Sequence, residues 1–195
     1  IPEYSRLKTA DISKQFSPNK NANELRGIYY NKETHKYYGA ARFSSGIFVF
    51  DSSFNILELI PAPLFTNKYT YKETCTDRIT MDGSGRLWVT GHETYIKIPG
   101  SNKFDHIRNV LPAFNWIESK GEFSDILTTK EGNILMRGAG SIIYVINHKT
   151  LKTDTVKIPQ FNYKESYQIG LSIILYDSSR SLCYFSNDHV CVQYN

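Results

Sequence analysis

Four stretches of the chain share one pattern of hydrophobic and polar positions, in which an apolar run, a polar turn and a second apolar run follow one another. In 79–90, apolar and polar residues alternate, residues 82–85 supply a turn rich in Gly and Ser, and the apolar residues 87–89 follow. Turn residues of these types bend the backbone at little cost, and the flanking apolar residues favour strands. The pattern recurs at 28–38, 126–136 and 174–184. Each copy is therefore predicted to form a β-hairpin.

The spacing of the four hairpins indicates a structural repeat. The first apolar residues after the turns are Tyr37, Leu87, Ile134 and Leu182, which are separated by 50, 47 and 48 residues. A period of this size, built from short strands, is typical of a β-propeller. The predicted fold class is therefore all-β, a β-propeller with four recognisable four-stranded blades.

The predicted blades occupy about 25–60, 77–107, 123–158 and 170–195, and segment 1–24 is either irregular or the end of a preceding blade. The last predicted blade ends within its third strand. A propeller must close its ring, because its terminal blades otherwise expose apolar faces and strand edges. We therefore expect these blades to be part of a larger propeller. The alternative is a four-bladed ring that segment 1–24 closes by supplying the missing outer strand.

Composition and charge narrow the classes of protein. The 195 residues are 41% hydrophobic and 14% aromatic, which is enough for a packed core and argues against disorder. The net charge of +4 is scattered along the chain, so no nucleic-acid partner is expected. There is no apolar run long enough to span a membrane, and no membrane contact is expected within this segment. Because the first residue is Ile, we expect a mature or excised piece of a longer protein.

The three cysteines, Cys75, Cys183 and Cys191, are an odd number, which argues against a disulfide framework. Cys183 and Cys191 flank a predicted hairpin turn. With a two-residue turn their thiols would point to opposite faces of the sheet and could not bond, whereas a three-residue loop would place them directly opposite each other. A bridge between them stays open at this point.

The clearest hairpin carries a motif that resembles a known repeat. Asp82 is followed by Gly85 and then by the run Leu87, Trp88, Val89 and Thr90, which resembles the core of two-component-regulator propeller repeats. The run 46–51, Gly-Ile-Phe-Val-Phe-Asp, is similar to another segment of the same repeat. The other copies depart from it: the Trp is present only in the second blade, and the third has Lys130 and Glu131 near the position of the aspartate.

The resemblance implies a location and a role. Repeats of this family form the extracytoplasmic, periplasmic sensor regions of membrane histidine kinases and hybrid sensors, which are common in Bacteroidetes. It therefore implies a sensor domain for signal transduction in a two-component system, with a possible homodimer formed through flanking regions. No kinase, phosphoacceptor or regulator segment is present in this sequence.

A ligand site is expected on one face of the propeller. The connections between blades and the loops between second and third strands lie on the same face, and the predicted long connections are 61–76, 108–122 and 159–169. Long loops on a rigid scaffold often carry function. Their aromatic residues suit a sugar or a peptide, and arginines suit an anion. The candidate ligand-binding residues are Arg26, Tyr69, Tyr71, Arg78, His92, Trp116, Arg137, Tyr163 and Tyr167. Alternatively, the aromatic residues only pack the loops onto the blades.

Catalytic and metal-binding motifs are absent from the sequence. The glycines at 83–85 and 138–140 precede strands rather than helices, so they are predicted to form turns and not phosphate loops. The histidines lack metal-ligand spacing, and no metal or cofactor is expected. We therefore expect non-enzymatic recognition of a carbohydrate or other nutrient signal. The alternatives are a protein-interaction scaffold and a propeller enzyme, a glycoside hydrolase or lactonase, using acids such as Glu24, Asp77, Glu122 and Asp125.

Overall fold

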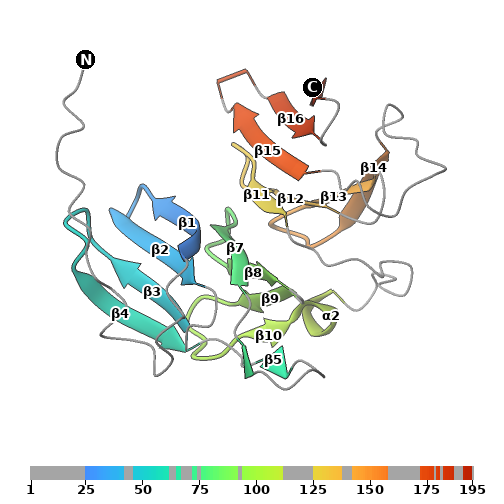
Figure 1. Ribbon diagram of the computed structural model, residues 1–195. Helices are drawn as coiled ribbons and strands as arrows, with labels where there is room; N and C mark the ends of the chain where they lie inside the picture. The colour runs from blue at the N-terminus through green and yellow to red at the C-terminus, as the bar shows by residue number, and fades with distance from the viewer. Residues whose placement is uncertain are drawn as a thin grey trace, which may run out of the picture.

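The computed structural model describes twelve stretches of the chain. They are 25–41, 46–61, 65–66, 72–73, 76–91, 94–111, 125–137, 142–157, 172–177, 179–180, 182–186 and 191–194. Within them the protein is almost entirely β, in antiparallel sheets, and this confirms the all-β prediction (Figure 1).

Four of the sheets are called blades 1 to 4 in chain order. Blade 1 contains β1 (Leu25–Asn31), β2 (Lys36–Ala41), β3 (Gly46–Phe50) and β4 (Ile56–Pro61). Blade 2 contains β7 (Thr76–Met81), β8 (Leu87–Gly91), β9 (Thr94–Lys97) and β10 (Asp105–His106). Blade 3 contains β11 (Ile126–Thr128), β12 (Ile134–Arg137), β13 (Ile142–Ile146) and β14 (Thr153–Lys157). Blade 4 contains β15 (Ser172–Asp177), β16 (Leu182–Ser186) and β17 (Cys191–Tyr194).

The first strands of the blades lie innermost. β1 contacts β7, β7 contacts β11, and β11 contacts β15. Figure 1 shows the remaining strands of each blade extending outward from these four, which is the arrangement of a β-propeller. Two short elements were not predicted: a ribbon of β5 (Phe65–Thr66) and β6 (Lys72–Glu73), and the helix α2 (Ile107–Val110) that follows β10.

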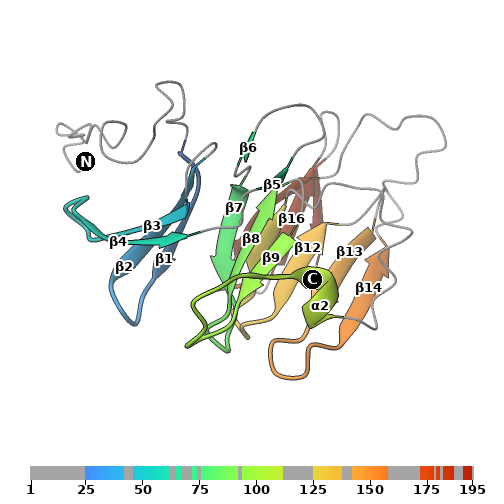
Figure 2. The ribbon, with the colours of Figure 1, turned by 90° about the horizontal axis from the view of Figure 1, so that it is seen from below.

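Similar turns end the inner strands of three blades, at Asn31, Asp82 and Asp177. In each, the side-chain Oδ1 accepts a hydrogen bond from the backbone N–H two residues later and from a second N–H three or four residues later. Such side-chain bonds replace backbone turn bonds and favour these residue types. The pKa of Asp177 is also lowered, mainly by the hydrogen bond from the side chain of Ser179 and to a smaller extent by the one from its backbone. The turns gather on one side of the molecule, the lower side in Figure 2, which is called the turn side.

The hydrophobic core lies between the blades. Between blades 1 and 2 the main buried residues are Ala40, Ile47, Val49, Ile60, Ile79, Leu87, Val89 and Phe104. Between blades 2 and 3 they include Trp88, Ile96, Ile126, Ile134, Met136 and Ile146. Because alternate residues of a strand point to opposite faces, Leu87 and Val89 pack toward blade 1 whereas Trp88 packs toward blade 3. Blade 2 is therefore stabilised on both of its faces.

The register of blade 4 decides the arrangement of two cysteines. Cys183 pairs with Tyr194, and Cys191 pairs with Ser186, so the two cysteines are not opposite each other on the two strands. Neither the predicted two-residue turn nor the predicted three-residue loop occurs, because residues 187–190 separate the strands. Cys183 is a free, buried thiol. Burial raises the pKa of the Cys183 thiol, and the negative charge of Glu131 raises it further. The thiolate form is therefore less populated at neutral pH than in an exposed cysteine.

Candidate functional site

Three charged residues meet at the junction of blades 2 and 3, at the end of the inner strands opposite the turn side. Arg78 on β7 and Arg137 on β12 flank Asp125, which directly precedes β11. Arg78 Nε lies 3.7 Å from Asp125 Oδ1, and an Arg137 terminal nitrogen lies 3.7 Å from Asp125 Oδ2. The carboxylate of Asp125 is buried, whereas the side chain of Arg78 is 51% exposed and that of Arg137 is 22% exposed. We call these three residues the arginine cluster.

Matching positions on adjacent inner strands place the arginine cluster. Asp82 and Thr129 occupy matching positions at the ends of β7 and β11, since each donates its backbone N–H to the carbonyl four residues later. Arg78 and Asp125 each lie four residues before these positions, so they face each other at the same level of adjacent inner strands. The backbone N–H of Arg137 donates to the carbonyl of Asp125 over 3.0 Å and fixes the third member beside them.

The arrangement can recognise an anion or a hydroxyl-rich molecule. A guanidinium carries five N–H donors in a planar fork, so one group can hold a carboxylate and still meet a second acceptor. Asp125 orients both guanidinium groups through its two oxygens. The carboxylate, which was an alternative catalytic candidate, is thereby engaged in ion pairs.

Most of the other predicted site residues lie where the structure gives no description. Arg26 is in β1, but only its backbone is described. Asp77 is likewise described only as part of β7. The candidates outside the described residues are Tyr69, Tyr71, His92, Trp116, Tyr163 and Tyr167, together with the alternative acids Glu24 and Glu122. Their roles stay predictions, and the arginine cluster is the part of the predicted site whose side-chain geometry is described.

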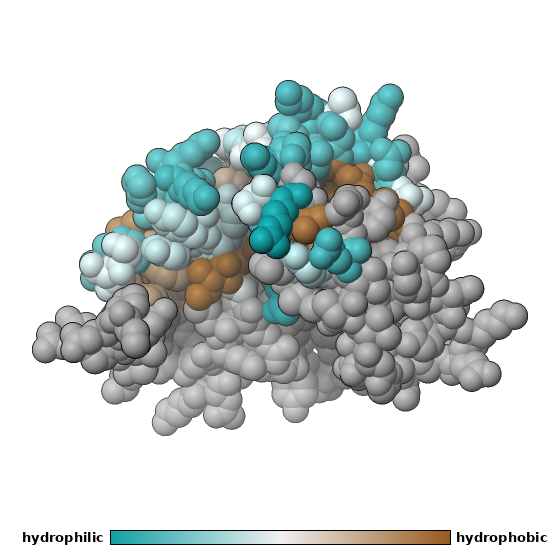
Figure 3. Space-filling model, turned by 90° about the horizontal axis from the view of Figure 1, so that it is seen from above, coloured by the Kyte–Doolittle hydropathy of each residue, from teal (hydrophilic) through white to brown (hydrophobic). Residues whose placement is uncertain are grey.

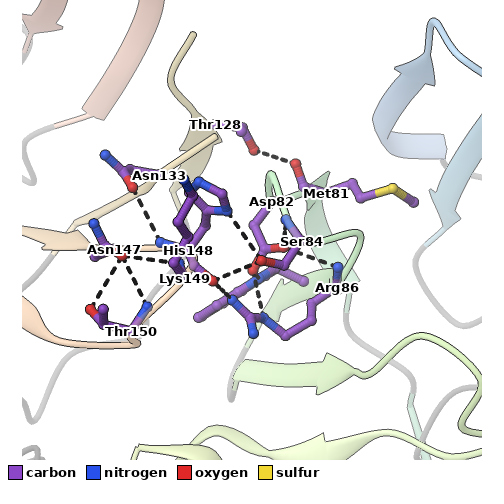
Figure 4. A network of polar contacts seen from close by, with 11 residues as sticks. Met81, Asp82, Ser84, Arg86, Thr128, Asn133, Asn147, His148, Lys149 and Thr150 are labelled. Atoms are coloured by element: carbon purple, nitrogen blue, oxygen red, sulfur yellow. Dashed lines mark hydrogen bonds and ion pairs between the residues drawn. The ribbon is translucent and has the colours of Figure 1, made fainter. Parts of the chain in front are cut away.

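A second polar cluster lies at the turn side of the same junction (Figure 4). Asp82 Oδ2 accepts hydrogen bonds from the indole Nε1 of Trp88 over 3.0 Å and from Nε of Arg86 over 2.7 Å. Asp82 and Trp88 are both buried. The spacing of aspartate, glycine and tryptophan in the repeat motif therefore has a structural cause: the aspartate shapes the turn and binds the tryptophan that follows it.

This second cluster joins blade 2 to blade 3. Arg86 and Ser84 both donate to the carbonyl of His148, and Ser84 Oγ lies 3.1 Å from His148 Nδ1. The backbone N–H of Gly83 donates to the carbonyl of Gly132 over 2.9 Å. His148 is half-buried at the junction. Sequence spacing gave no signal for this contact, because its partners lie more than 60 residues away.

Two other findings concern the described part of the chain. It contains no group of three or more His, Cys, Asp or Glu side chains that could hold a metal ion. No helix in it has the length and apolar character needed to cross a lipid bilayer.

Comparisons with known proteins show what the chain is similar to. No family model and no curated protein matches it. Among solved structures, the extracellular domain of the hybrid two-component system BT4673 from B. thetaiotaomicron is 15% identical over 91% of this chain, with a TM-score of 0.60. The extracellular domain of the hybrid two-component system BT3049 from the same organism is 16% identical over 89% of this chain, with a TM-score of 0.53. The chain shares the fold of the aligned part of these extracellular domains.

The likeness covers only part of those proteins. This chain spans 22% of the BT4673 and BT3049 domains. It also aligns with virginiamycin B lyase from Staphylococcus aureus, with a TM-score of 0.58 and 14% identity over 92% of this chain and 57% of the lyase. The two-component neighbours match the family whose repeat the motif of blade 2 resembles.

Replacing Asp125 by asparagine is expected to lower the free energy of unfolding by about 1–3 kcal/mol, because the change removes the buried negative charge that pairs with two guanidinium groups. The matched control is Asp105→Asn, whose partner Lys103 is 80% exposed. An exposed pair contributes about 0–1 kcal/mol, so the control should lose less. Urea unfolding of both variants measures the difference, and equal losses would show that the arginine cluster does not stabilise the junction.

Proposed function

We propose that this chain is part of the extracytoplasmic ligand-sensing propeller of a membrane-bound two-component regulator. The observation that carries the proposal is the arginine cluster, which holds two oriented guanidinium groups, from β7 and β12, at the junction of blades 2 and 3. Recognition sites commonly lie at the loop ends of such rigid scaffolds. The fold shared with extracellular domains of two-component systems supports an extracytoplasmic location and a role in signal transduction.

The proposed ligand is a carbohydrate or other nutrient signal with hydroxyl or acidic groups. Guanidinium groups donate hydrogen bonds to such acceptors, and most strongly to anions. The predicted aromatic residues Tyr69, Tyr71, Trp116, Tyr163 and Tyr167 would supply stacking surface for sugar rings. Arg26 and His92 complete the proposed set. The ligand would leave chemically unchanged, and no cofactor takes part.

Two further features belong to the proposal. The ring would contain more blades than the four described here, and the sensor would pair with a second copy through regions that flank this chain. A ligand changes signalling only if it binds two arrangements of the sensor with different affinities. Ligand binding would therefore have to favour one arrangement of the pair.

Ligand-induced thermal stabilisation tests the proposal. A ligand present at about 100 times its dissociation constant stabilises the folded state by about 2.7 kcal/mol, which for a chain of this size corresponds to a rise in Tm of about 5–10 °C. We expect such a rise with at least one member of a panel of neutral and acidic oligosaccharides. The variants Arg78→Gln and Arg137→Gln should reduce it by more than half.

Arg180→Gln is the matched control, because Arg180 pairs with Asp177 in a turn on the turn side of blade 4. This variant should keep the full thermal shift. Loss of the shift in all three arginine variants would indicate nonspecific charge binding and contradict the proposed site. Product formation from a stabilising oligosaccharide would instead favour a propeller enzyme, the alternative that the likeness to a lyase supports.

A further inference from the structure

Blade 1 has one face that no described blade covers. Its other face packs on blade 2 through Ala40, Ile47 and Val49. This face carries a row of aromatic rings and one aliphatic residue near its inner edge. Within it Ile28, Tyr30 and Phe54 are 54%, 39% and 45% exposed, whereas Phe50 is buried against Tyr37. We call this surface the aromatic face, and its residues are Ile28, Tyr30, Tyr37, Phe50 and Phe54. Figure 3 shows hydrophobic side chains reaching the surface on the side where Figure 1 places β1 to β4.

The aromatic rings form a continuous row across β1, β2 and β3. The ring centroids are 4.7 Å apart for Tyr30 and Tyr37, 5.4 Å for Tyr37 and Phe50, and 5.7 Å for Phe50 and Phe54. The last two pairs are stacked, with interplanar angles of 8° and 17°. Rings stacked on one another direct their faces at each other. The row therefore resembles a packing surface more than a platform on which a sugar ring could lie.

The internal repeat shows what covers the same position in the next two blades. Ile28, Ile79 and Ile126 each lie three residues before the matching strand-end positions Asn31, Asp82 and Thr129. Ile79 is 6% exposed in the core shared with blade 1, and Ile126 is 7% exposed in the core shared with blade 2. Ile28 is 54% exposed. In blades 2 and 3 the preceding blade thus buries this isoleucine.

The second strand of each blade shows the same difference in burial between blade 1 and the two blades that follow it. Tyr37 pairs with Tyr30, Leu87 with Met81, and Ile134 with Thr128, so Tyr37, Leu87 and Ile134 are equivalent. Leu87 is 3% exposed in the core with blade 1, and Ile134 is completely buried in the core with blade 2. The aromatic face of blade 1 therefore corresponds to the surface with which blades 2 and 3 each pack on the blade before them.

We propose that the aromatic face of blade 1 is the docking surface for a further blade of the same polypeptide. The incoming blade presents an apolar sheet face like the one that Trp88 and Ile96 present to blade 3. The inference rests on the proposed larger ring but not on ligand sensing. It is supported by the solved structures with this fold, whose chains extend well beyond the aligned part.

Thiol labelling of an Ile28→Cys variant tests the proposal without any ligand, so its outcome is independent of the sensing function. The rate of maleimide labelling is measured in the isolated 195-residue chain and in the complete gene product. We expect labelling at position 28 to be at least about tenfold slower in the complete gene product, because a docked blade must open before the thiol can react. The same chains with the native isoleucine give the background from the native cysteines.

Ile98→Cys is the matched control, because Ile98 follows β9 of blade 2 and is 42% exposed. Its labelling rate should be the same in both chains. Equal rates at position 28 in both chains would overturn the proposal. Protection of position 28 in the isolated chain that disappears on dilution would also overturn it, since a second copy would then be the occupant.

Discussion

Replacing Trp88 by alanine is expected to lower the free energy of unfolding by about 3–5 kcal/mol, the range for loss of a large aromatic side chain from a core. Trp88 is completely buried between blades 2 and 3, where it belongs to the same core as Ile96, Ile134 and Ile146. The substitution would leave a cavity there. It would also remove the indole N–H that binds Asp82, whose carboxylate stays buried. Urea unfolding followed by circular dichroism measures the loss.

Trp88→Phe is the matched control, because it keeps most of the apolar ring but cannot donate to Asp82. We expect it to cost about 1–3 kcal/mol, the penalty of losing one partner of a buried charged group. Arg86 still binds the carboxylate in this variant. A loss below about 1 kcal/mol for Trp88→Ala would contradict the assignment of Trp88 to the central packing of this junction.

Replacing Gly132 by alanine is expected to cost about 2–5 kcal/mol, from a left-handed backbone conformation and a steric clash together. Gly132 has a φ of +85° in the turn between β11 and β12. A Cβ atom at this position would lie 2.5 Å from the Cα of Gly83 and 2.9 Å from its backbone nitrogen. Both neighbours are backbone atoms of the facing turn in blade 2, so the blades would have to separate.

Gly100→Ala separates the two contributions. Gly100 has a φ of +79°, and no atom lies within 4 Å of where its Cβ would be. This variant should lose only the conformational part, about 1–2 kcal/mol. The comparison uses urea unfolding of both variants, and the additional loss in Gly132→Ala measures the close contact between the blades. Equal losses would mean that the two turns move apart easily and that their contact contributes little.

The strands and turns could be predicted from the sequence because their causes are local. Alternation of apolar and polar residues marks both faces of a strand. Asn31, Asp82 and Asp177 bond to backbone groups only a few residues away, so each turn is specified by its own residues. The repeat period then indicated an all-β propeller. Arg78 and Arg137 were also selected from the sequence, because arginines near the long connections suit anion recognition.

The tertiary structure alone decided which distant residues meet. Asp125 could have been a catalyst or an ion-pair partner, and the packing of β7 beside β11 made it the partner of two arginines. His148 binds Ser84 and Arg86 across the junction of blades 2 and 3. Gly83 donates a backbone hydrogen bond to Gly132 across the same junction. Such contacts depend on the position of one sheet relative to the next. That position is set by the packing of whole sheet faces, and no local stretch of sequence is sufficient to determine it.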